Sequence, residues 1–201
     1  MGQTADRAVA AARSAFSISG AEKPQKGAER PMVSEAFRGE FYQKVDSKAR
    51  VSIPAAFRRI LEAEDPASAE FPRARAYLVY GGKSRRFVEC YSKAGADAVA
   101  ARIEAMELGS PERDRAERDL ISRSVMVEVE PDGRIVLPAK VREKMGFVGD
   151  DLTSGGEAAF AGYTNRFKLY RREVYEAELA EDDEDDTVDP LALVGRASRA
   201  G

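Results

Sequence analysis

One stretch of the chain occurs twice, and this duplication constrains the fold more than any other feature. Residues 45–58 read VDSKARVSIPAAFR, and residues 129–142 read VEPDGRIVLPAKVR. Aligning Arg50 with Arg134 gives a period of 84 residues, at which an Arg, a Pro, an Ala and the closing Arg are identical. Other apolar positions exchange Val, Ile, Leu or Phe for one another. The chain is therefore predicted to build the same small unit twice.

Each copy has the pattern of a strand, a tight turn, a second strand and a helix. Apolar and polar residues alternate on both sides of the turns DSKA and EPDG, which is typical of half-buried strands. Pro54 and Pro138 suit the first position of a helix. Apolar residues at helical spacing follow, namely Phe57, Ile60 and Leu61 in the first copy and Val141 and Met145 in the second, where Gly146 is predicted to end the helix.

A carboxylate precedes the turn arginine by four residues in both copies. These pairs are Asp46 with Arg50 and Glu130 with Arg134. A tight turn would fold the carboxylate back onto the guanidinium as a charge-assisted pair. Asp46 and Glu130 are therefore predicted to be structural turn partners.

The rest of the chain shows further strand and helix patterns. Matching VECYS with FKLYR extends the duplication to the end of each copy, and Cys90, between apolar neighbours, favours a buried strand thiol over a reactive one. Ser110 followed by Pro111 predicts a helix start. We predict strands at 37–45, 76–79, 86–91, 158–161 and 167–170, a loop at 62–75, and helices at 94–107 and 111–123.

Composition argues against an enzyme. The 201 residues include no His and one Cys, which excludes Ser-His and Cys-His nucleophiles, His-based metal sites and thiolate zinc sites. No Gly-rich phosphate loop is present. We therefore predict no catalysis, no metal and no cofactor. A single Cys suits a reducing cytoplasm, and the chain has no run of 18 apolar residues that would predict a membrane span.

The net charge of −3 is unevenly distributed. Residues 1–34 and 35–175 each carry +2, whereas residues 176–201 carry −7. A nearly neutral central region can still bind phosphates if its Lys and Arg gather on one face. Disorder is predicted for residues 1–34, which would be either a DNA-wrapping arm or an inert extension, and Met32 is an alternative start. Disorder is also predicted for residues 176–186, which would be either a solubilising tail or a DNA mimic.

Four separated motifs together resemble the MraZ family of bacterial transcriptional regulators over roughly residues 36–175. They are FRGEFYQKVDSKARVSIPAAFR, the linking SPERDRAERDL, VEPDGRIVLPAKVREKMGF and FAGYTNRFKLY. The resemblance implies an α+β fold of two tandem swapped-hairpin SpoVT/AbrB-type modules, at 35–92 and 125–175. A helical linker at 93–124 would join them, with disordered extensions at 1–34 and 176–201.

The resemblance also implies a function. It suggests a sequence-specific regulator, usually a repressor, of the division and cell-wall gene cluster, located in the cytoplasm at the nucleoid. Its partners would be double-stranded DNA, at direct repeats in the promoter, and further copies of itself in a ring-shaped homo-oligomer. No membrane and no small-molecule substrate are implied. The alternative is an AbrB-type antitoxin that binds DNA and, through its acidic tail, a toxin.

Two positions depart from the family pattern. Ala49 stands where the family's first turn has Gly, so a positive φ at this position would be strained. Glu130 stands where Asp is expected, and its longer side chain would loosen the second turn.

Basic residues near the turns and helix starts are the candidate DNA contacts. Arg suits bidentate contact with guanine, and Lys suits phosphate. The resemblance supports Arg50 and Arg134 most strongly, as the Arg of the family's D-x-x-x-R motif; a purely structural salt bridge is the alternative, and both roles are compatible. The candidates are Lys48, Arg50, Arg58 and Arg59 in the first copy and Arg134, Lys140 and Arg142 in the second.

Overall fold

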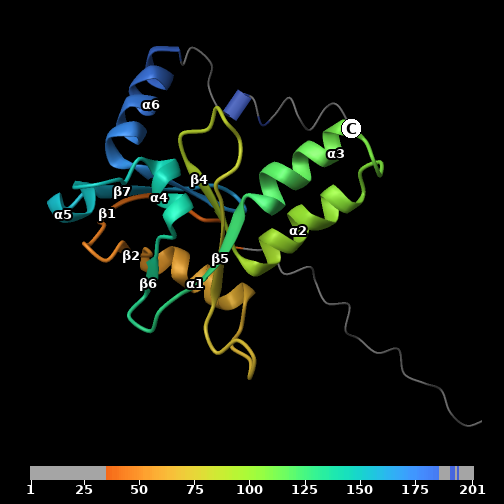
Figure 1. The fold of residues 1–201 in the computed structure, drawn as a ribbon, viewed down its shortest axis with the longest axis horizontal. Coiled ribbons are helices and arrows are strands. Elements are labelled where there is room, and N and C mark those ends of the chain that lie inside the picture. Colours follow the sequence, from red (N-terminus) through yellow and green to blue (C-terminus); the bar gives the residue numbers. More distant parts are fainter. Residues whose placement is uncertain (1–34, 186–190, 193, 195–201) are drawn as a thin grey trace, which may run out of the picture. The chain divides into compact units, whose positions relative to one another are not determined.

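The fold is known from a computed structural model that describes residues 35–185, 191–192 and 194. The predictions for residues 1–34 and for the end of the acidic tail lie outside the described residues. No helix in the described ranges is long and apolar enough to cross a membrane. The chain runs through β1 (Glu40–Lys44), β2 (Arg50–Ser52), α1 (Ala55–Glu64), β3 (Arg75–Val79), β4 (Val88–Tyr91), α2 (Lys93–Glu104), α3 (Pro111–Ala116), η1 (Glu117–Ser122), β5 (Ser124–Glu128), β6 (Arg134–Val136), α4 (Ala139–Met145), α5 (Asp151–Ser154), β7 (Glu157–Gly162), β8 (Phe167–Arg171) and α6 (Arg172–Asp185) (Figure 1).

The strands of the two sequence copies interleave in one antiparallel sheet. Its order is β1-β7-β8-β4-β3-β5, and a separate two-stranded ribbon pairs β2 with β6. Strand β1 of the first copy therefore pairs with β7 of the second, and β3 of the first copy pairs with β5 of the second. The two copies share one sheet instead of folding as two separate small domains, because each leaves strand edges that only the other copy pairs.

The arrangement has an internal pseudo-two-fold relationship. Exchanging β1 with β5, β3 with β7 and β4 with β8 leaves the order of the sheet unchanged. The ribbon is centred on Val51 opposite Ile135, which are equivalent residues at the 84-residue period. Each turn is also closed alike, since Asp46 N donates to Arg50 O at 2.9 Å and Glu130 N donates to Arg134 O at 2.7 Å. The sequence repeat is thus a structural repeat.

The larger of two apolar clusters among the described residues lies between the two copies. The predicted helix faces are confirmed, since Phe57, Ile60 and Leu61 of α1 and Val141 and Met145 of α4 are buried. Phe57 packs against Phe167 of the second copy, with ring centroids 5.1 Å apart. Burial of large side chains from both copies at one centre makes each copy depend on the other for its stability.

The helix ends follow the sequence closely. Pro54 and Pro138 occupy the N-cap position, one residue before the predicted site, and Gly146 ends α4 with φ 78° as predicted. Ser110 caps α3 by accepting a hydrogen bond from Arg113 N at 3.2 Å. The predicted helix at 111–123 changes character part-way, because α3 continues as the π-helical segment η1.

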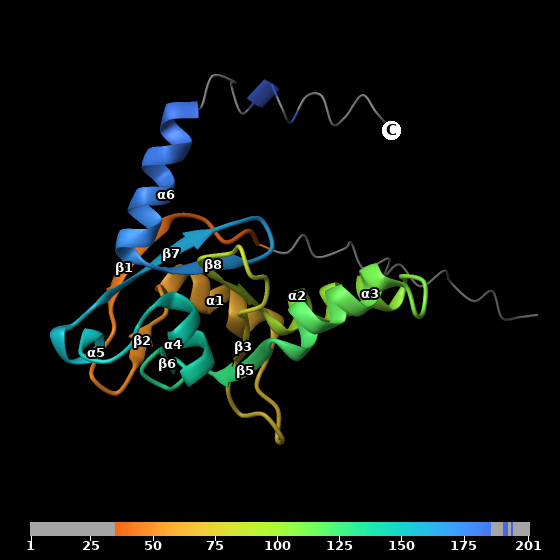
Figure 2. The same cartoon turned by 45° about the horizontal axis from the view of Figure 1, so that its top comes forward.

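The prediction of disorder at 176–186 is wrong as far as Asp185, where helix α6 ends (Figure 2). Tyr175 is only 5% exposed and stacks on Tyr170, with ring centroids 5.0 Å apart. Arg172 pairs with Glu176 at 2.7 Å, and the Tyr170 hydroxyl donates to Glu178 at 3.0 Å. The prediction of disorder rested on repulsion among the carboxylates, and these contacts offset that repulsion.

The predicted loop at 62–75 contains a buried ion pair. Asp65 is 7% exposed, and its carboxylate accepts from Arg75 Nε at 2.8 Å and from Arg75 Nη2 at 2.7 Å. The backbone N of Arg75 also donates to Asp65, at 2.9 Å. The pair fixes the end of α1 to the start of β3.

Candidate nucleic-acid interface

The first turn is held by the side chain of Asp46. Its Oδ1 accepts from the backbone N–H groups of Lys48 and Arg50, both at 2.9 Å. Its Oδ2 accepts from Arg50 Nε at 2.8 Å and forms an ion pair with Arg50 Nη2, also at 2.8 Å. The Arg50 backbone N–H, followed by its guanidinium, lowers the pKa of Asp46, and the same carboxylate raises the pKa of Arg50. The predicted pair is confirmed, and it remains ionised at neutral pH.

The second turn is closed by a different acid from the one predicted. Arg134 Nε lies 3.4 Å from Asp132 Oδ2, and Arg134 N donates to Asp132 Oδ1 at 3.2 Å. Glu130 contributes its backbone, which bonds to Arg134 and to Gly133. The predicted side-chain pair of Glu130 with Arg134 is therefore wrong, because Asp132, two residues before the arginine, has the short side chain that closes such a turn.

The two turn arginines meet on the β2–β6 ribbon. Arg50 lies opposite Val136, and Arg134 lies opposite Ser52. Arg134 Nη1 lies 3.8 Å from Asp46 Oδ2, so this carboxylate contacts both guanidinium groups. The arginine side chains are 32% and 40% exposed, which leaves donors available to a ligand. We name Asp46, Arg50, Asp132 and Arg134 the turn cluster.

A cavity of about 510 Å³ adjoins the turn cluster. Its charged lining consists of Lys44, Arg50 and Arg134 against Asp46 and Glu157. Lys48 is exposed at the tip of the first turn, and Asp132 adds a third carboxylate beside Arg134. The positive and negative charges are nearly balanced here, so this surface would attract an anion through the exposed donors of the two arginines and the lysines.

Arg58 reaches the second turn from helix α1. It lies so close to Gly133 that a Cβ placed there would be 1.7 Å from Arg58 Nη1, and Arg58 Nε lies 3.7 Å from Glu62. The structure thus brings Arg58 against Gly133, the residue before Arg134. Arg58 and Gly133 come from different copies, and only the interleaved fold places them together.

The other predicted residues lie apart from these contacts. Lys140 pairs with Glu143 at 2.9 Å, and this hydrogen bond raises the pKa of Lys140. Arg59 is exposed, and Arg142 Nε is buried without a hydrogen-bond partner among the described residues. Within the described part of the chain, no ion pair or hydrogen bond joins Arg59, Lys140 or Arg142 to the turn cluster.

Both turns require a left-handed residue before the arginine. Ala49 has φ 60° and Gly133 has φ 79°. The strain expected at Ala49 is therefore present, because an L-residue with a Cβ rarely adopts this conformation. Burial of Ala49 in the shared core holds it there.

Sequence reasoning missed three residues of the site. Asp132 had a readable signal, since an Asp two residues before a turn backbone N–H commonly accepts from it. Lys44 and Glu157 had none, because they meet only through the register of β1 with β7. Across the described residues, His, Cys, Asp and Glu do not gather in threes that could hold a metal ion.

Comparison with known proteins identifies the family. No protein-family model matches the chain. A Cereibacter sphaeroides protein named transcriptional regulator MraZ is 50% identical over 152 residues, which cover 76% of this chain and 89% of that protein. Proteins of the same name from a Ruegeria species and from Ruegeria pomeroyi are 41% and 40% identical, over 82% and 73% of this chain and 98% and 83% of their own lengths. The chain therefore belongs to the MraZ family of transcriptional regulators.

Proposed function

We propose that this chain regulates transcription by binding double-stranded DNA through the β2–β6 ribbon. One observation carries the proposal: Arg50 and Arg134, from the two copies, lie side by side on this ribbon and share the carboxylate of Asp46. A two-stranded ribbon is narrow enough to enter the major groove. The family name supports a role in transcription.

Each residue has a distinct role in this proposal. Arg50 and Arg134 make bidentate contacts with guanine, and Asp46 fixes their orientation before DNA arrives. Lys48 neutralises a phosphate from the tip of the first turn, and Arg58 does so beside the second. The flanking basic residues Arg59, Lys140 and Arg142 add contacts to the DNA backbone.

A single chain offers few cationic groups, so tight binding requires repetition. We propose that copies of the chain assemble into a ring and that the ring binds successive direct repeats in its own promoter. Head-to-tail contacts close into a ring when the rotation between neighbours permits. Tethering several weak contacts multiplies the affinity when the spacing of sites matches. Occupancy of the promoter then represses the division and cell-wall gene cluster.

Fluorescence anisotropy with promoter fragments of equal length tests this proposal. The fragments carry the full set of repeats, one repeat, or none, and light scattering reports the oligomeric state under the same conditions. Affinity is expected to fall steeply as repeats are removed. Equal affinity for all three fragments would contradict sequence-specific, multivalent binding.

A further inference from the structure

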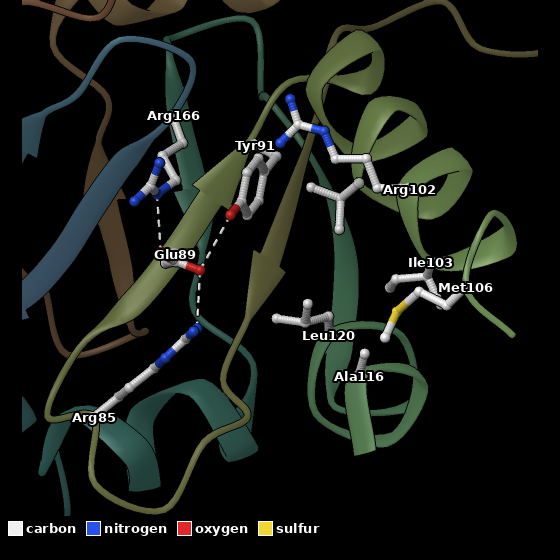
Figure 3. A pocket seen from close by; sticks show the side chains of 10 residues that line it. Arg85, Glu89, Tyr91, Arg102, Ile103, Met106, Ala116, Leu120 and Arg166 are labelled. Carbon is white, nitrogen blue, oxygen red and sulfur yellow. Dashed lines mark hydrogen bonds and ion pairs between the residues drawn. The ribbon is translucent and has the colours of Figure 1, made fainter. Parts of the chain in front are cut away.

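A second cavity of about 390 Å³ lies away from the turn cluster, between the helices of the linker and the sheet. Figure 3 shows its two unlike sides. Arg85, Glu89, Tyr91 and Arg166 form one side, at strand β4 and the segments beside it. The other side is mostly apolar and comes from α2, the segment after it, α3 and η1, through Ile103, Met106, Ala116 and Leu120, with Arg102 of α2 beside them.

The charged side is organised by a buried carboxylate. Glu89 has a side chain only 7% exposed, and its Oε2 accepts from Arg85 Nη1 at 2.9 Å and from the Tyr91 hydroxyl at 3.1 Å. Its Oε1 accepts from Arg166 Nε at 2.9 Å. Burial, followed by the charge of Glu89, raises the pKa of Tyr91 to about 12. Glu89 is satisfied, and it holds both arginines at fixed positions.

Positive charge remains after this pairing. Three guanidinium groups, of Arg85, Arg102 and Arg166, line the cavity against the single carboxylate of Glu89. Arg102 is exposed at the rim, and in the described part of the chain its side chain has no ion pair or hydrogen bond. Each guanidinium carries five N–H donors. Glu89 uses one from Arg85 and one from Arg166, and Asn165 Oδ1 accepts a further one from Arg166 Nη1 at 3.0 Å. An anion entering the cavity would find donors available.

The apolar side has an unusual backbone. Leu120 is presented by η1, a π-helical segment of six residues, and such segments occur frequently at functional sites. A smaller, mostly apolar cavity of about 210 Å³ shares Tyr91, Val99 and Leu120 with the first. An apolar chain entering the first cavity could therefore extend beneath α2.

We propose that this cavity binds a small amphipathic anion, a carboxylate or phosphate with an aliphatic chain. The anionic group pairs with Arg102 and with the free donors of Arg85 and Arg166. The chain packs on Ile103, Met106 and Leu120. The volume is within the range of about 300–1,000 Å³ typical of small-ligand sites, which combine apolar walls with a few convergent polar groups.

Isothermal titration calorimetry of the full chain with octanoate, octyl phosphate and octanol tests the proposal without DNA. One of the two anions is expected to bind once per chain and at least tenfold more tightly than octanol, and the better anion identifies the head group. Failure of both anions to bind, or equal binding of octanol, would overturn the proposal. Because DNA is absent, this result is independent of the proposed DNA contacts.

Two variants place the ligand. Arg102→Gln removes the unpaired cation from an exposed position and is expected to weaken binding about fivefold. Ala116→Phe fills the cavity from a half-buried position and is expected to abolish binding. Arg118→Gln, an exposed arginine of η1 that does not line the cavity, is the charge-matched control and should bind normally.

The variants also have outcomes that overturn the site. Unchanged binding in Ala116→Phe, with a native thermal transition, would place the ligand elsewhere. If the wild-type chain binds neither anion and Ala116→Phe disrupts its oligomer, the cavity is a contact with a second copy of the chain, and the ligand proposal is wrong.

Discussion

The guanidinium of Arg58 lies against Gly133, so closely that a Cβ at Gly133 would come within 1.7 Å of Nη1. At the 84-residue period the equivalent pair is Arg142 and Ala49, where a Cβ is already present. Arg142 Nε is buried without a hydrogen-bond partner among the described residues. The two copies therefore differ at the residue before the turn arginine, and Gly133, which has no Cβ, leaves the space that the Arg58 guanidinium occupies.

Ala49→Gly is expected to stabilise the chain. Ala49 has φ 60°, a conformation that costs an L-residue about 1–2 kcal/mol and costs glycine little. The added flexibility of glycine in the unfolded state and the loss of the buried Ala49 methyl group offset much of this gain, so a net increase of at most about 1 kcal/mol in the free energy of unfolding is expected. Urea denaturation measures it, and a loss of stability would contradict the strain assigned to this turn.

Gly133→Ala is expected to have the opposite effect. The residue at this position has φ 79°, which is strained for alanine, and the new Cβ would clash with the guanidinium of Arg58. The substitution therefore destabilises both the turn and its contact with helix α1. We expect a loss of about 2 kcal/mol in the free energy of unfolding. Repeating the substitution in an Arg58→Ala background should recover part of the loss, and no recovery would contradict the contact.

The Asp65–Arg75 pair is expected to contribute to stability in a pH-dependent way. Asp65→Asn leaves the buried Arg75 contact uncompensated and should lower the free energy of unfolding by about 2 kcal/mol at pH 7. The hydrogen bond from the Arg75 side chain lowers the pKa of Asp65 below its ordinary value of 3.8. A carboxyl group with a lowered pKa stabilises the fold above its unfolded value and loses that contribution as the pH falls through the folded value.

Chemical denaturation at pH 7 and at pH 3 measures this linkage. The difference in stability between wild type and Asp65→Asn is expected to shrink on acidification. A constant difference across this range would show that the ionised carboxylate is not the source of the effect.

The local features of the fold were readable from the sequence because they depend on neighbouring residues. The turn at Asp46 and the helix end at Gly146 follow from side-chain reach and backbone freedom within a few positions. Pro54 was predicted at the first position of the helix and occupies the N-cap, one position earlier. The buried thiol of Cys90 followed from its apolar neighbours.

Long-range features could not be predicted, because the alternation of apolar and polar residues indicates a strand but not the strand with which it pairs. Nothing in the pattern of β1 indicates that it pairs with β7 of the other copy, and this pairing alone brings Lys44 opposite Glu157. The acidic run was misjudged because its carboxylates were counted and the buried Tyr175 beside it was not. Both the pairing of β1 with β7 and the helix in the acidic segment depend on contacts between residues far apart in the sequence.

Tyr175 is expected to anchor helix α6. Its ring is buried against Tyr170 and lies 6.5 Å from the ring of Tyr42, so Tyr175→Ala should lower the free energy of unfolding by about 3 kcal/mol. It should also reduce the helical signal in circular dichroism. Tyr175→Phe, which keeps the ring and removes only the interaction of the hydroxyl with Glu40, is the control and should lose about 1 kcal/mol. Equal effects of the two variants would contradict anchoring by the ring.

Cys90 is expected to be inert in the folded chain. Complete burial raises the pKa of its thiol well above the ordinary value, which suppresses the reactive thiolate. Ellman's reagent at pH 8 should label the thiol only after denaturant is added. Rapid labelling of the native chain would contradict the burial of β4.

The most direct test of the proposed DNA contact is the promoter affinity of the Arg50→Ala/Arg134→Ala double variant. Arg115→Ala/Arg118→Ala, two exposed arginines of α3 and η1, removes equal charge as a control. Each bidentate guanine contact is worth about 1–3 kcal/mol, so loss of both should weaken binding by at least about thirtyfold, while the cooperative thermal transition and the oligomeric state are retained. Promoter affinity within twofold of wild type, in a folded and assembled double variant, would contradict the account.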